Sequence, residues 1–598
     1  MCGIAGIIHK NSSSYYASIE KMNLSQKHRG PDGGGIVKLN SAILGHTRLS
    51  IVDIDSGHQP MSCNDKNVTI TFNGEIYGYK DLRKDSSYDF ITHSDTEVII
   101  ALYKQYNLKM FSKLKGMFAF GIWNTEKKSL LLARDRFGEK PLYYAFGDNG
   151  EFIFSSEIKA IIASKLISPK FSRKAIGNYL QHLYIDPLET IYENIYSLPP
   201  ASFLEFIDGK INIQRYYSYP TTKDISVADA TDIFRIKFEK SVENQLIADV
   251  DVGAFLSGGL DSSTIVAIAQ KYKSNLKTFS FGFEGSKSEL SYAREIANKY
   301  NTNHYEFFAK DVDISEILLK MADVYDEPFA DSSNIPTYLI SKLAREHSKV
   351  VLTGDGADEL LGGYGWWYNP LLGIGKSSNY FKEMTLRILA KGFFKSYQSR
   401  VNKMQCGRKY TTVMSAHLNR SVNFKDNEID DLLNINYIKN RSYAFEEENT
   451  INDALKVDLQ EYMAGDILVK TDRASMANSL ELRSPFLDVD FASFCISLPA
   501  SLKITSQKDK YILRQAYQNA WTDSIRERGK QGFGAPVDRW LKQKSMAILK
   551  DEYFKKHQTI FSYVSFNAAK KYFFKDNYQT WILLVLSIWF EKNAKYIE

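Results

Sequence analysis

Alternation of hydrophobic and polar positions over short runs dominates the first third of the chain, and Gly, Asn and Asp separate the runs. Such runs predict half-buried β-strands joined by turns. Helical periodicity interrupts them near Ser94–Tyr106 and Glu157–Ser164. The pattern predicts an α+β half with mostly antiparallel sheet. The predicted strands are Gly3–Ile8, Ala42–His46, Val68–Phe72, Phe118–Trp123, Ser129–Arg134, Leu142–Phe146, Glu151–Ser155, Ala201–Ile207 and Ile211–Tyr217.

The pattern changes after the turn-rich segment Ser218–Ile225, where apolar runs begin to alternate with stretches of helical period. Alternating strands and helices predict an α/β parallel sheet with helices on both faces. Beyond residue 365 the periodicity is mostly helical. We therefore expect two domains, 1–217 and 218–598. The predicted strands of the second domain are Val250–Leu256, Thr278–Phe283, Tyr305–Phe308 and Lys349–Leu352, with helices from Ser262 and up to Tyr300.

Composition narrows the class of protein. The chain is 44% hydrophobic and 24% charged with a net charge of +6, which is typical of a globular protein. Lys and Arg are scattered, so we expect no nucleic-acid partner. The apolar stretch Trp581–Phe590 is shorter than the ~20 residues of a membrane span, which favours a core helix and no membrane partner. The N-terminus lacks signal-peptide character, and the cysteines are widely spaced without a CxxC pair, so we expect a cytoplasmic location.

The second residue is a cysteine. Removal of Met1 would leave Cys2 with a free α-amino group. That amine titrates near 8 and can act as the base for its own thiol. The alternative is an ordinary buried cysteine at the start of the chain. Cys2 by itself does not separate these two interpretations.

Four further segments place polar residues beside turn glycines or apolar strands. Glutamine carries a carboxylate and an ammonium, so its binding site needs an arginine and an acid. Hydrolysis of its amide needs donors for an oxyanion. Each segment alone could be a capped turn, and Asn73-Gly74 alone is an ordinary hairpin turn. Together they indicate a glutamine site; they are Arg29–Asp32, His46–Ile51, Phe72–Tyr77 and Ser94–Glu97.

With Arg134–Gly138 and Pro141–Tyr144, these segments resemble the glutaminase domain of class II glutamine amidotransferases. The resemblance implies an N-terminal-nucleophile fold, an αββα sandwich. It implies that Cys2 is the nucleophile and that Arg48 binds the glutamine carboxylate. It also implies that Asn73 and Gly74 form the oxyanion hole, and that Glu75 and Asp95 hold the polar groups of glutamine.

The segment Ser257–Ser263 (SGGLDSS) lies between an apolar strand and a helix. Glycines let the backbone approach phosphates, and a helix N-terminus presents N–H donors. Asp261 can hold Mg²⁺. The alternative is a plain strand-to-helix turn with a serine cap. Other nucleotide motifs are incomplete. A GxxxxGK loop ending at Lys376 would need glycine at Pro370, and a GxGxxG motif starting at Gly354 would need glycine at Glu359.

A second loop, Thr353–Glu359, follows the last predicted strand. Three carboxylates beside two glycines at the carboxyl end of a strand suit a metal and substrate site. An acidic loop that caps the next helix is the alternative.

The second half resembles the ATP-pyrophosphatase domain of glutamine-hydrolysing asparagine synthetases, and both halves occur in that family's order. Leu482–Asp488 and Lys530–Gly534 also match family segments. The resemblance implies that Lys510 meets the phosphates in the transition state, although a lysine here could also be an ordinary solvated helix residue. It implies the following further roles: Ser257, Gly258, Gly259, Asp261 and Ser262 form the pyrophosphate loop, Leu256, Phe281, Thr353 and Gly354 line the ATP site, Asp261 and Asp358 bind Mg²⁺, and Asp355 reaches the acceptor.

The implied reaction has two stages. A carboxylate attacks the α-phosphorus of ATP, and ammonia from the Cys2 site then displaces AMP from the acyl-adenylate. The first choice of acceptor is aspartate, with a uronic acid of a bacterial surface polysaccharide as the alternative. A β-lactam-forming relative is disfavoured because Cys2 is present. A non-catalytic scaffold on the same fold is the alternative of another class, and the family suggests a homodimer.

Two features bear on the acceptor. The family often carries Glu where this chain has Asp355, which is one methylene shorter. The stretch from Gly365 to Glu448 is longer than in compact members and is aromatic-rich at Trp366, Trp367 and Tyr368. Helical packing and a larger acceptor site are the two interpretations of that stretch.

Overall fold

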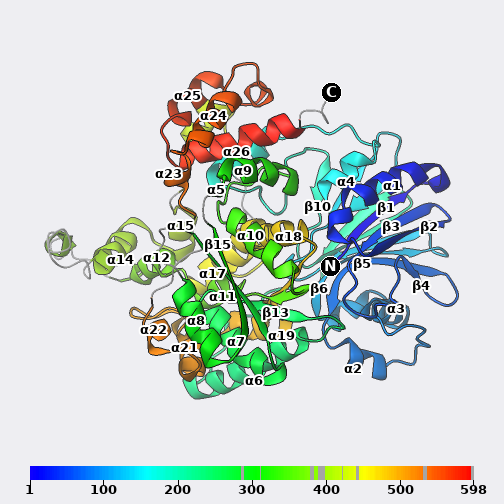
Figure 1. Ribbon diagram of the computed structural model, residues 1–598, viewed down its shortest axis with the longest axis horizontal. Coiled ribbons are helices and arrows are strands. Elements are labelled where there is room, and N and C mark those ends of the chain that lie inside the picture. Colours follow the sequence, from blue (N-terminus) through cyan, green and yellow to red (C-terminus); the bar gives the residue numbers. More distant parts are fainter. Residues whose placement is uncertain are drawn as a thin grey trace.

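The computed structural model describes residues 1–283, 289–309, 312–376, 383–387, 398–420, 422–438, 443–528 and 535–593. The segment Lys530–Gly534 lies outside these residues, as do parts of the stretch 365–448. The chain forms two halves that lie side by side, with the N-terminus between them (Figure 1).

The N-terminal half contains two six-stranded antiparallel sheets. The first has the order β10-β8-β9-β1-β3-β2 and the second the order β12-β11-β7-β6-β5-β4. The strands of the first sheet are β1 (Gly3–Ile8), β2 (Gly33–Leu39), β3 (Ala42–Arg48), β8 (Tyr143–Phe146), β9 (Phe152–Ser155) and β10 (Ile195–Ser197). Those of the second are β4 (Met61–Ser62), β5 (Val68–Ile76), β6 (Gly116–Asn124), β7 (Ser129–Arg134), β11 (Ser202–Ile207) and β12 (Lys210–Arg215).

Alternation along the strands builds this half as four layers. Ile4 and Ile8 of β1 point into the core between the sheets, whereas Ala5 and Ile7 point to the outer helices. The helices α1 (Tyr16–Ser25) and α4 (Ile158–Ala163) cover the first sheet. On the second sheet lie α2 (Tyr79–Lys84) and α3 (Asp95–Tyr106). The predicted αββα sandwich is confirmed.

Helix α1 was not expected from the sequence. Its buried residues are Ile19 and Met22, and most of its other side chains lie toward solvent. So few apolar positions do not produce a visible helical period, because the helix is held by docking on the sheet rather than by a broad apolar stripe.

The C-terminal half is built on a five-stranded parallel sheet of order β15-β14-β13-β16-β17. In β16, Val350 and Leu352 face one layer of helices and Val351 faces the other. The first layer includes α6 (Val227–Gln245) and α7 (Leu260–Tyr272), and the second includes α10 (Asn334–Arg345), with α18 (Leu468–Met476) beside it. The predicted parallel sheet covered on both faces is confirmed. Its strands are β13 (Val252–Phe255), β14 (Lys277–Phe283), β15 (Asn303–Ala309), β16 (Val350–Leu352) and β17 (Glu481–Arg483).

Strand β17 is an exception to the mostly helical pattern predicted beyond residue 365. It is a short strand between helices, and it pairs with β16 in parallel register. So short a strand shows no alternation of its own, because its place is set by pairing with a strand far earlier in the sequence.

Helices make up most of the remaining chain. The last of them, α26 (Tyr578–Asn593), is buried along Thr580–Phe590, as expected for a core helix. None of the helices in the described part of the chain is long and apolar enough to cross a membrane. The other helices are α5 (Arg173–His182), α8 (Leu290–Lys299), α9 (Ile314–Val324), α11 (Ala357–Leu361), α12 (Gly365–Tyr368), α14 (Gln398–Lys409), α15 (Val413–Leu418), α16 (Asp426–Leu433), α17 (Ile451–Gln460), α19 (Val489–Ser497), α20 (Ala500–Lys503), α21 (Tyr511–Tyr517), α22 (Asp523–Arg526), α23 (Val537–Trp540), α24 (Lys544–Tyr553) and α25 (Phe566–Phe573).

The described part of the stretch 365–448 packs as helices around Tyr368. The Tyr368 side chain is buried, and its hydroxyl donates to Asp458 at 2.6 Å. Trp366 is 53% exposed, and Trp367 stacks with Arg420. Neither tryptophan lines the larger cavity described below.

Buried ion pairs join the two halves. Arg29 forms a two-pronged contact with Asp472, at 2.8 and 2.9 Å, and is fully buried. Arg473 lies 3.0 Å from Glu157. Apolar side chains of the N-terminal half, including Met117 and Phe137, pack in the same core as the helices of the C-terminal half. The halves therefore share a core and a set of matched charges.

Candidate functional site

The first site surrounds Cys2, which precedes β1. The Cys2 side chain is buried, and its backbone N–H donates to Asn73 Oδ1 at 2.9 Å. Burial raises the pKa of the Cys2 thiol, and the neighbouring N-terminal ammonium only partly offsets this. The thiol therefore needs a nearby base to become a nucleophile.

Met1 occupies the boundary between the halves. Its ammonium lies 2.7 Å from Glu481 Oε2, and its side chain packs with Leu49 and Ile51. The Cys2 nitrogen in this chain is a peptide nitrogen. The predicted role of that nitrogen as a base therefore requires cleavage of the Met1–Cys2 bond.

A cavity of about 30 Å³ opens beside the thiol and is lined by Cys2, Arg48, Gly74, Glu75 and Asp95. The Arg48 guanidinium donates to the carbonyls of Ile54 at 2.9 Å and Asp53 at 2.6 Å, which fixes its direction. Asp95 is the first residue of α3 and accepts from the N–H of Ile76 at 2.9 Å. Burial raises the pKa of Asp95 to about 6 and that of Glu75 well above its ordinary value.

The predicted oxyanion residues lie on β5. Asn73 is fully buried, and its Nδ2 has no hydrogen-bond partner among the described residues, so it is a donor held beside the thiol. Gly74 has φ +152°, and a Cβ there would lie 2.1 Å from the carbonyl oxygen of Met117. Only glycine fits so close to β6.

Two charged residues of β17 complete this site and were not assigned a role from the sequence. Arg483 lies 3.1 Å from Glu75 Oε2 and 2.7 Å from Glu481 Oε1. Glu481 also lines the cavity. No local signal could have revealed them, because the contact from Arg483 to Glu75 spans 408 residues of sequence.

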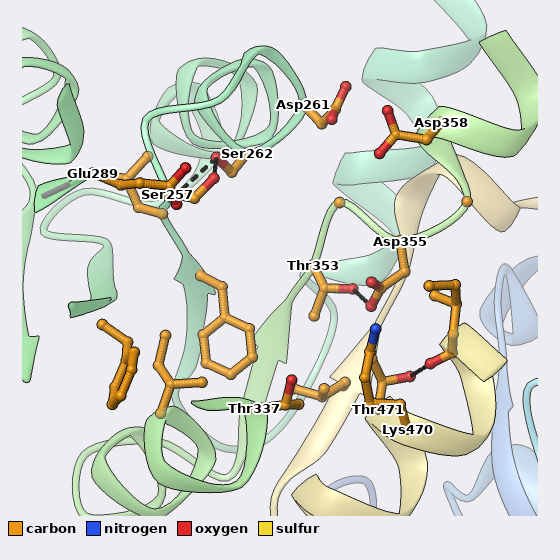
Figure 2. A pocket seen from close by; sticks show the side chains of 18 of the residues that line it. Ser257, Asp261, Ser262, Glu289, Thr337, Thr353, Asp355, Asp358, Lys470 and Thr471 are labelled. Atoms are coloured by element: carbon orange, nitrogen blue, oxygen red, sulfur yellow. Dashed lines mark hydrogen bonds between the residues drawn. The ribbon is translucent and has the colours of Figure 1, made fainter. Parts of the chain in front are cut away.

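The second site is a larger cavity of about 220 Å³ at the carboxyl ends of the parallel strands (Figure 2). A neighbouring cavity of about 60 Å³ adjoins it through Ser257 and Asp261. The structure brings together every residue predicted for the ATP and metal sites. Leu256, Ser257, Asp261, Ser262, Phe281, Thr353, Gly354, Asp355 and Asp358 line the larger cavity, and Gly258, Gly259 and Lys510 line the smaller one.

The glycine-rich loop is shaped by its own hydroxyls. Ser262 Oγ accepts from the N–H of Ser257 at 3.2 Å, and Ser257 Oγ accepts from the N–H of Gly259 at 3.3 Å. Gly258 has φ +67°, and a Cβ there would lie 2.4 Å from Tyr292 Cβ. The loop leads into α7, whose first turn faces both cavities. This is a geometry that suits phosphate groups.

Lys510 is not a solvated helix residue. It lies ahead of α21 with φ 47°, and its side chain is buried. Its Nζ is 2.6 Å from both Asp261 and Asp358 (the two carboxylates appear in Figure 2). Two carboxylates already gathered around one cation fit Mg²⁺, which takes one or two carboxylates together with phosphate oxygens. The described residues contain no cluster of three or more potential metal ligands.

The acidic loop, Thr353–Glu359, follows the end of β16. Asp355 accepts a hydrogen bond from Thr353 Oγ1 at 2.6 Å. Gly356 has φ +83°, and a Cβ there would lie 2.4 Å from Leu487, so the turn needs glycine. Three cationic or polar residues at these cavities were missed from the sequence, since each lies on a helix or loop without a motif; they are Arg528, Lys470 and Thr471.

Comparison with known proteins decides the family. Residues 234–591 match the family described as asparagine synthase, and residues 1–217 match the glutamine amidotransferase domain. This chain belongs to the asparagine synthase family.

The chain is a glutamine-dependent ligase of this family. The chain is 35% identical to the glutamine-hydrolyzing asparagine synthetase 1 of Bacillus subtilis strain 168, over 91% of this chain and 88% of that protein. It is 33% identical to the glutamine-hydrolyzing asparagine synthetase B of Escherichia coli strain K12, over 61% of this chain and 65% of that protein. It is 34% identical to the glutamine-hydrolyzing asparagine synthetase 2 of Arabidopsis thaliana, over 61% of each chain.

Proposed function

We propose that this protein transfers the amide nitrogen of glutamine to aspartate, with ATP cleaved to AMP and pyrophosphate. The observation that carries the proposal is the pairing of two built sites in one packed chain. One site surrounds a buried thiol, and the other gathers a phosphate-type loop, two carboxylates and a lysine. The names of the relatives support aspartate as the acceptor.

The glutaminase reaction is proposed for domain 1–217. After cleavage of the Met1–Cys2 bond, the α-amino group of Cys2 takes the thiol proton, and the thiolate attacks the δ-carbonyl of glutamine. Asn73 Nδ2 and the N–H of Gly74 stabilise the oxyanion. The α-ammonium of Cys2 returns the proton to the amide nitrogen, which leaves as ammonia, and water hydrolyses the resulting thioester to glutamate. In this proposal Arg48 binds the carboxylate of glutamine, and Glu75 and Asp95 bind its ammonium.

The synthetase reaction is proposed for domain 218–598. The side-chain carboxylate of aspartate attacks the α-phosphorus of ATP, and pyrophosphate leaves. The N–H groups of Ser257–Gly259 and the Lys510 ammonium offset the charge on the leaving group. Leu256, Phe281 and Gly354 hold the nucleoside. Asp261 and Asp358 would hold Mg²⁺, and a bound Mg²⁺ supplies further positive charge against the phosphates.

Ammonia must then travel from the first site to the second. Ammonium is not nucleophilic, so the nitrogen has to cross as neutral ammonia through apolar surroundings. The shared core that contains Met117 and Phe137 is the proposed route. Ammonia attacks the acyl carbonyl, Asp355 accepts a proton, and AMP departs.

Substitution of the nucleophile tests the proposal. Cys2→Ala is expected to abolish asparagine formation from glutamine and to leave formation from ammonium chloride unchanged, because only the nitrogen source is lost. The measurement is asparagine, AMP and pyrophosphate formed from aspartate, ATP and Mg²⁺ with each nitrogen source. Wild-type protein that hydrolyses glutamine but forms no AMP with any acid contradicts the proposal, and so does a Cys2→Ala protein that still uses glutamine.

A further inference from the structure

The larger cavity contains a lysine that the reaction described above does not use. Lys470 is on α18 and lines this cavity together with Thr471, whereas Lys510 lines the smaller cavity. Figure 2 shows the Lys470 amine pointing toward the Asp355 carboxylate, at a distance from the loop of Ser257 and Ser262. Lys470 is therefore at the acceptor end of the cavity and not at the phosphate end.

Lys470 lies beside two carboxyl groups, those of Asp331 and Asp466. Its Nζ lies 3.0 Å from Asp331 Oδ2, and its side chain is 12% exposed. Burial raises the pKa of Asp466 well above its ordinary value, whereas the charge of Lys470 outweighs burial and helps to lower the pKa of Asp331 to about 2. That pair then carries one negative charge, which the lysine balances. An ammonium has three donors, so the contact with Asp331 leaves donors for a ligand.

The helix that carries Lys470 has an unusual start. Met463–Ile467 forms a π-helical turn immediately before α18. Asp466 lies in this turn, and Thr471 Oγ1 donates to the carbonyl of Ile467 at 3.0 Å. π-helical turns are rare and are found mostly at functional sites, because the extra residue changes which side chains face a cavity. Here the turn is followed by the two polar residues that face the cavity.

An acid lines the same cavity. Glu359 is buried, and Tyr364 donates to its Oε1 at 2.7 Å. A lysine and an acid in one cavity match a ligand with both a carboxylate and an ammonium. A sugar acid has no ammonium and has a single carboxylate, which must face ATP.

We infer that Lys470 determines acceptor specificity by binding the α-carboxylate of an amino dicarboxylic acid, while Glu359 binds its α-ammonium. The side-chain carboxylate of that acid then faces Asp355 and the phosphate loop. This inference rests on the proposed function.

The test compares aspartate with two acids that each lack one of its groups and with a sugar acid. Pyrophosphate release is measured with ATP, Mg²⁺ and ammonium chloride, which bypasses the Cys2 site. The acceptors are aspartate, β-alanine, which lacks the α-carboxylate, succinate, which lacks the ammonium, and glucuronate. Wild-type protein is expected to prefer aspartate.

Lys470→Met should raise the KM for aspartate by at least about tenfold, with a smaller change in kcat, because a charge-assisted hydrogen bond is lost. Its kcat/KM for β-alanine should change by less than about twofold, since the lost contact is to a group that β-alanine lacks.

Three controls separate this role from a structural one. Lys470→Arg keeps the charge and should recover part of the affinity for aspartate. Lys456→Met removes another buried lysine, which pairs with Glu448 at 2.7 Å away from the cavity, and should leave the KM for aspartate unchanged. The KM for ATP and the glutaminase rate of Lys470→Met should equal those of the wild type.

The outcomes are distinct. An unchanged KM for aspartate in Lys470→Met overturns the inference and leaves the proposed function standing. Wild-type protein that uses succinate, β-alanine or glucuronate as well as aspartate also overturns it, even where the variant does not fold. If wild-type protein releases pyrophosphate with none of these acids, the proposed function fails, and the inference fails with it.

Discussion

At the scale of single residues, Lys510 shows how one cation keeps two acids in place. Asp261 and Asp358 come from different loops, and each lies 2.6 Å from the Lys510 amine. Two carboxylates this close would repel each other without a cation between them. The left-handed backbone at Lys510, ahead of α21, turns the side chain into this position. The same charge lies beside the loop that is proposed to bind pyrophosphate.

Substitution of Lys510 should therefore affect only the second site. Lys510→Met is expected to lower pyrophosphate release by roughly 10²–10³-fold, which is typical of the loss of one group that stabilises developing charge. Glutamine hydrolysis should remain, and the measurement is both rates on the same preparation. Lys508→Met is the matched control, because Lys508 is exposed two residues earlier. A Lys510→Met protein with wild-type pyrophosphate release contradicts the role proposed for this lysine.

At the scale of elements, the short strand β17 makes contacts in both halves of the molecule. Its partner β16 leads into the acidic loop, and its two charged side chains extend into the glutaminase half. Arg483 is fully buried and also donates to the carbonyls of Gln245 at 2.9 Å and Ile247 at 2.7 Å. Strand β17 therefore holds Glu75 of the first site in place, although it lies far later in the sequence.

Removal of the Arg483 charge should leave Glu75 buried without this cation and take one of the cationic partners of Glu481 away. Arg483→Met is expected to lower the free energy of unfolding by about 3–5 kcal/mol, the usual cost of breaking a buried pair, and to raise the KM for glutamine. Urea unfolding and glutaminase kinetics measure the two effects. Lys115→Met is the control, since Lys115 joins the halves through an exposed pair with Asp490 at 2.6 Å and should change stability by no more than about 1 kcal/mol. Equal effects of the two substitutions would count against this account of β17.

Lys503 of α20 predicts a pH dependence of stability. Its amine is buried and donates to Asn452 Oδ1 at 2.9 Å and to the carbonyl of Ile496 at 3.1 Å, which joins α20 to α17 and α19. Burial lowers the pKa of Lys503 from 10.5 to about 7. Between these two values the unfolded chain binds the proton and the folded chain does not, so this group makes the free energy of unfolding rise with pH. Below about pH 7 the full cost of the buried charge remains.

The measurement is urea unfolding at several pH values from 6 to about 9. Wild-type protein should gain stability across this range, and Lys503→Met should lose most of that gain. The same slope in both proteins would show that Lys503 does not titrate as described.

The elements also show what the sequence could and could not predict. Ser257–Ser263 was predicted as a loop between strand and helix because its glycines, hydroxyls and flanking apolar run are contiguous. The same holds for Asn73 and Gly74 on β5. Strand β17, by contrast, has no signal of its own, and Lys470 lies on a helix whose π-helical start cannot be recognised from residue types. These features depend on contacts between distant segments.

At the scale of the whole molecule, the two halves are held together by buried ion pairs. Arg29 with Asp472 and Arg483 with Glu75 are separated by 443 and 408 residues of sequence. No local pattern predicts such pairs, although the presence and order of the two halves were predicted. Because buried pairs depend strongly on geometry, the halves are expected to keep one relative arrangement rather than move freely.

One backbone hydrogen bond has a functional consequence. The N–H of Thr353 donates to the carbonyl of Arg483 at 2.8 Å, while the Arg483 side chain contacts Glu75. Arg483 thus joins Glu75, which is proposed to bind the ammonium of glutamine, to the end of β16 that leads to Asp355. If a displacement at one end of this connection moves the other, release of nitrogen and readiness of its recipient are timed together, and little ammonia escapes unused.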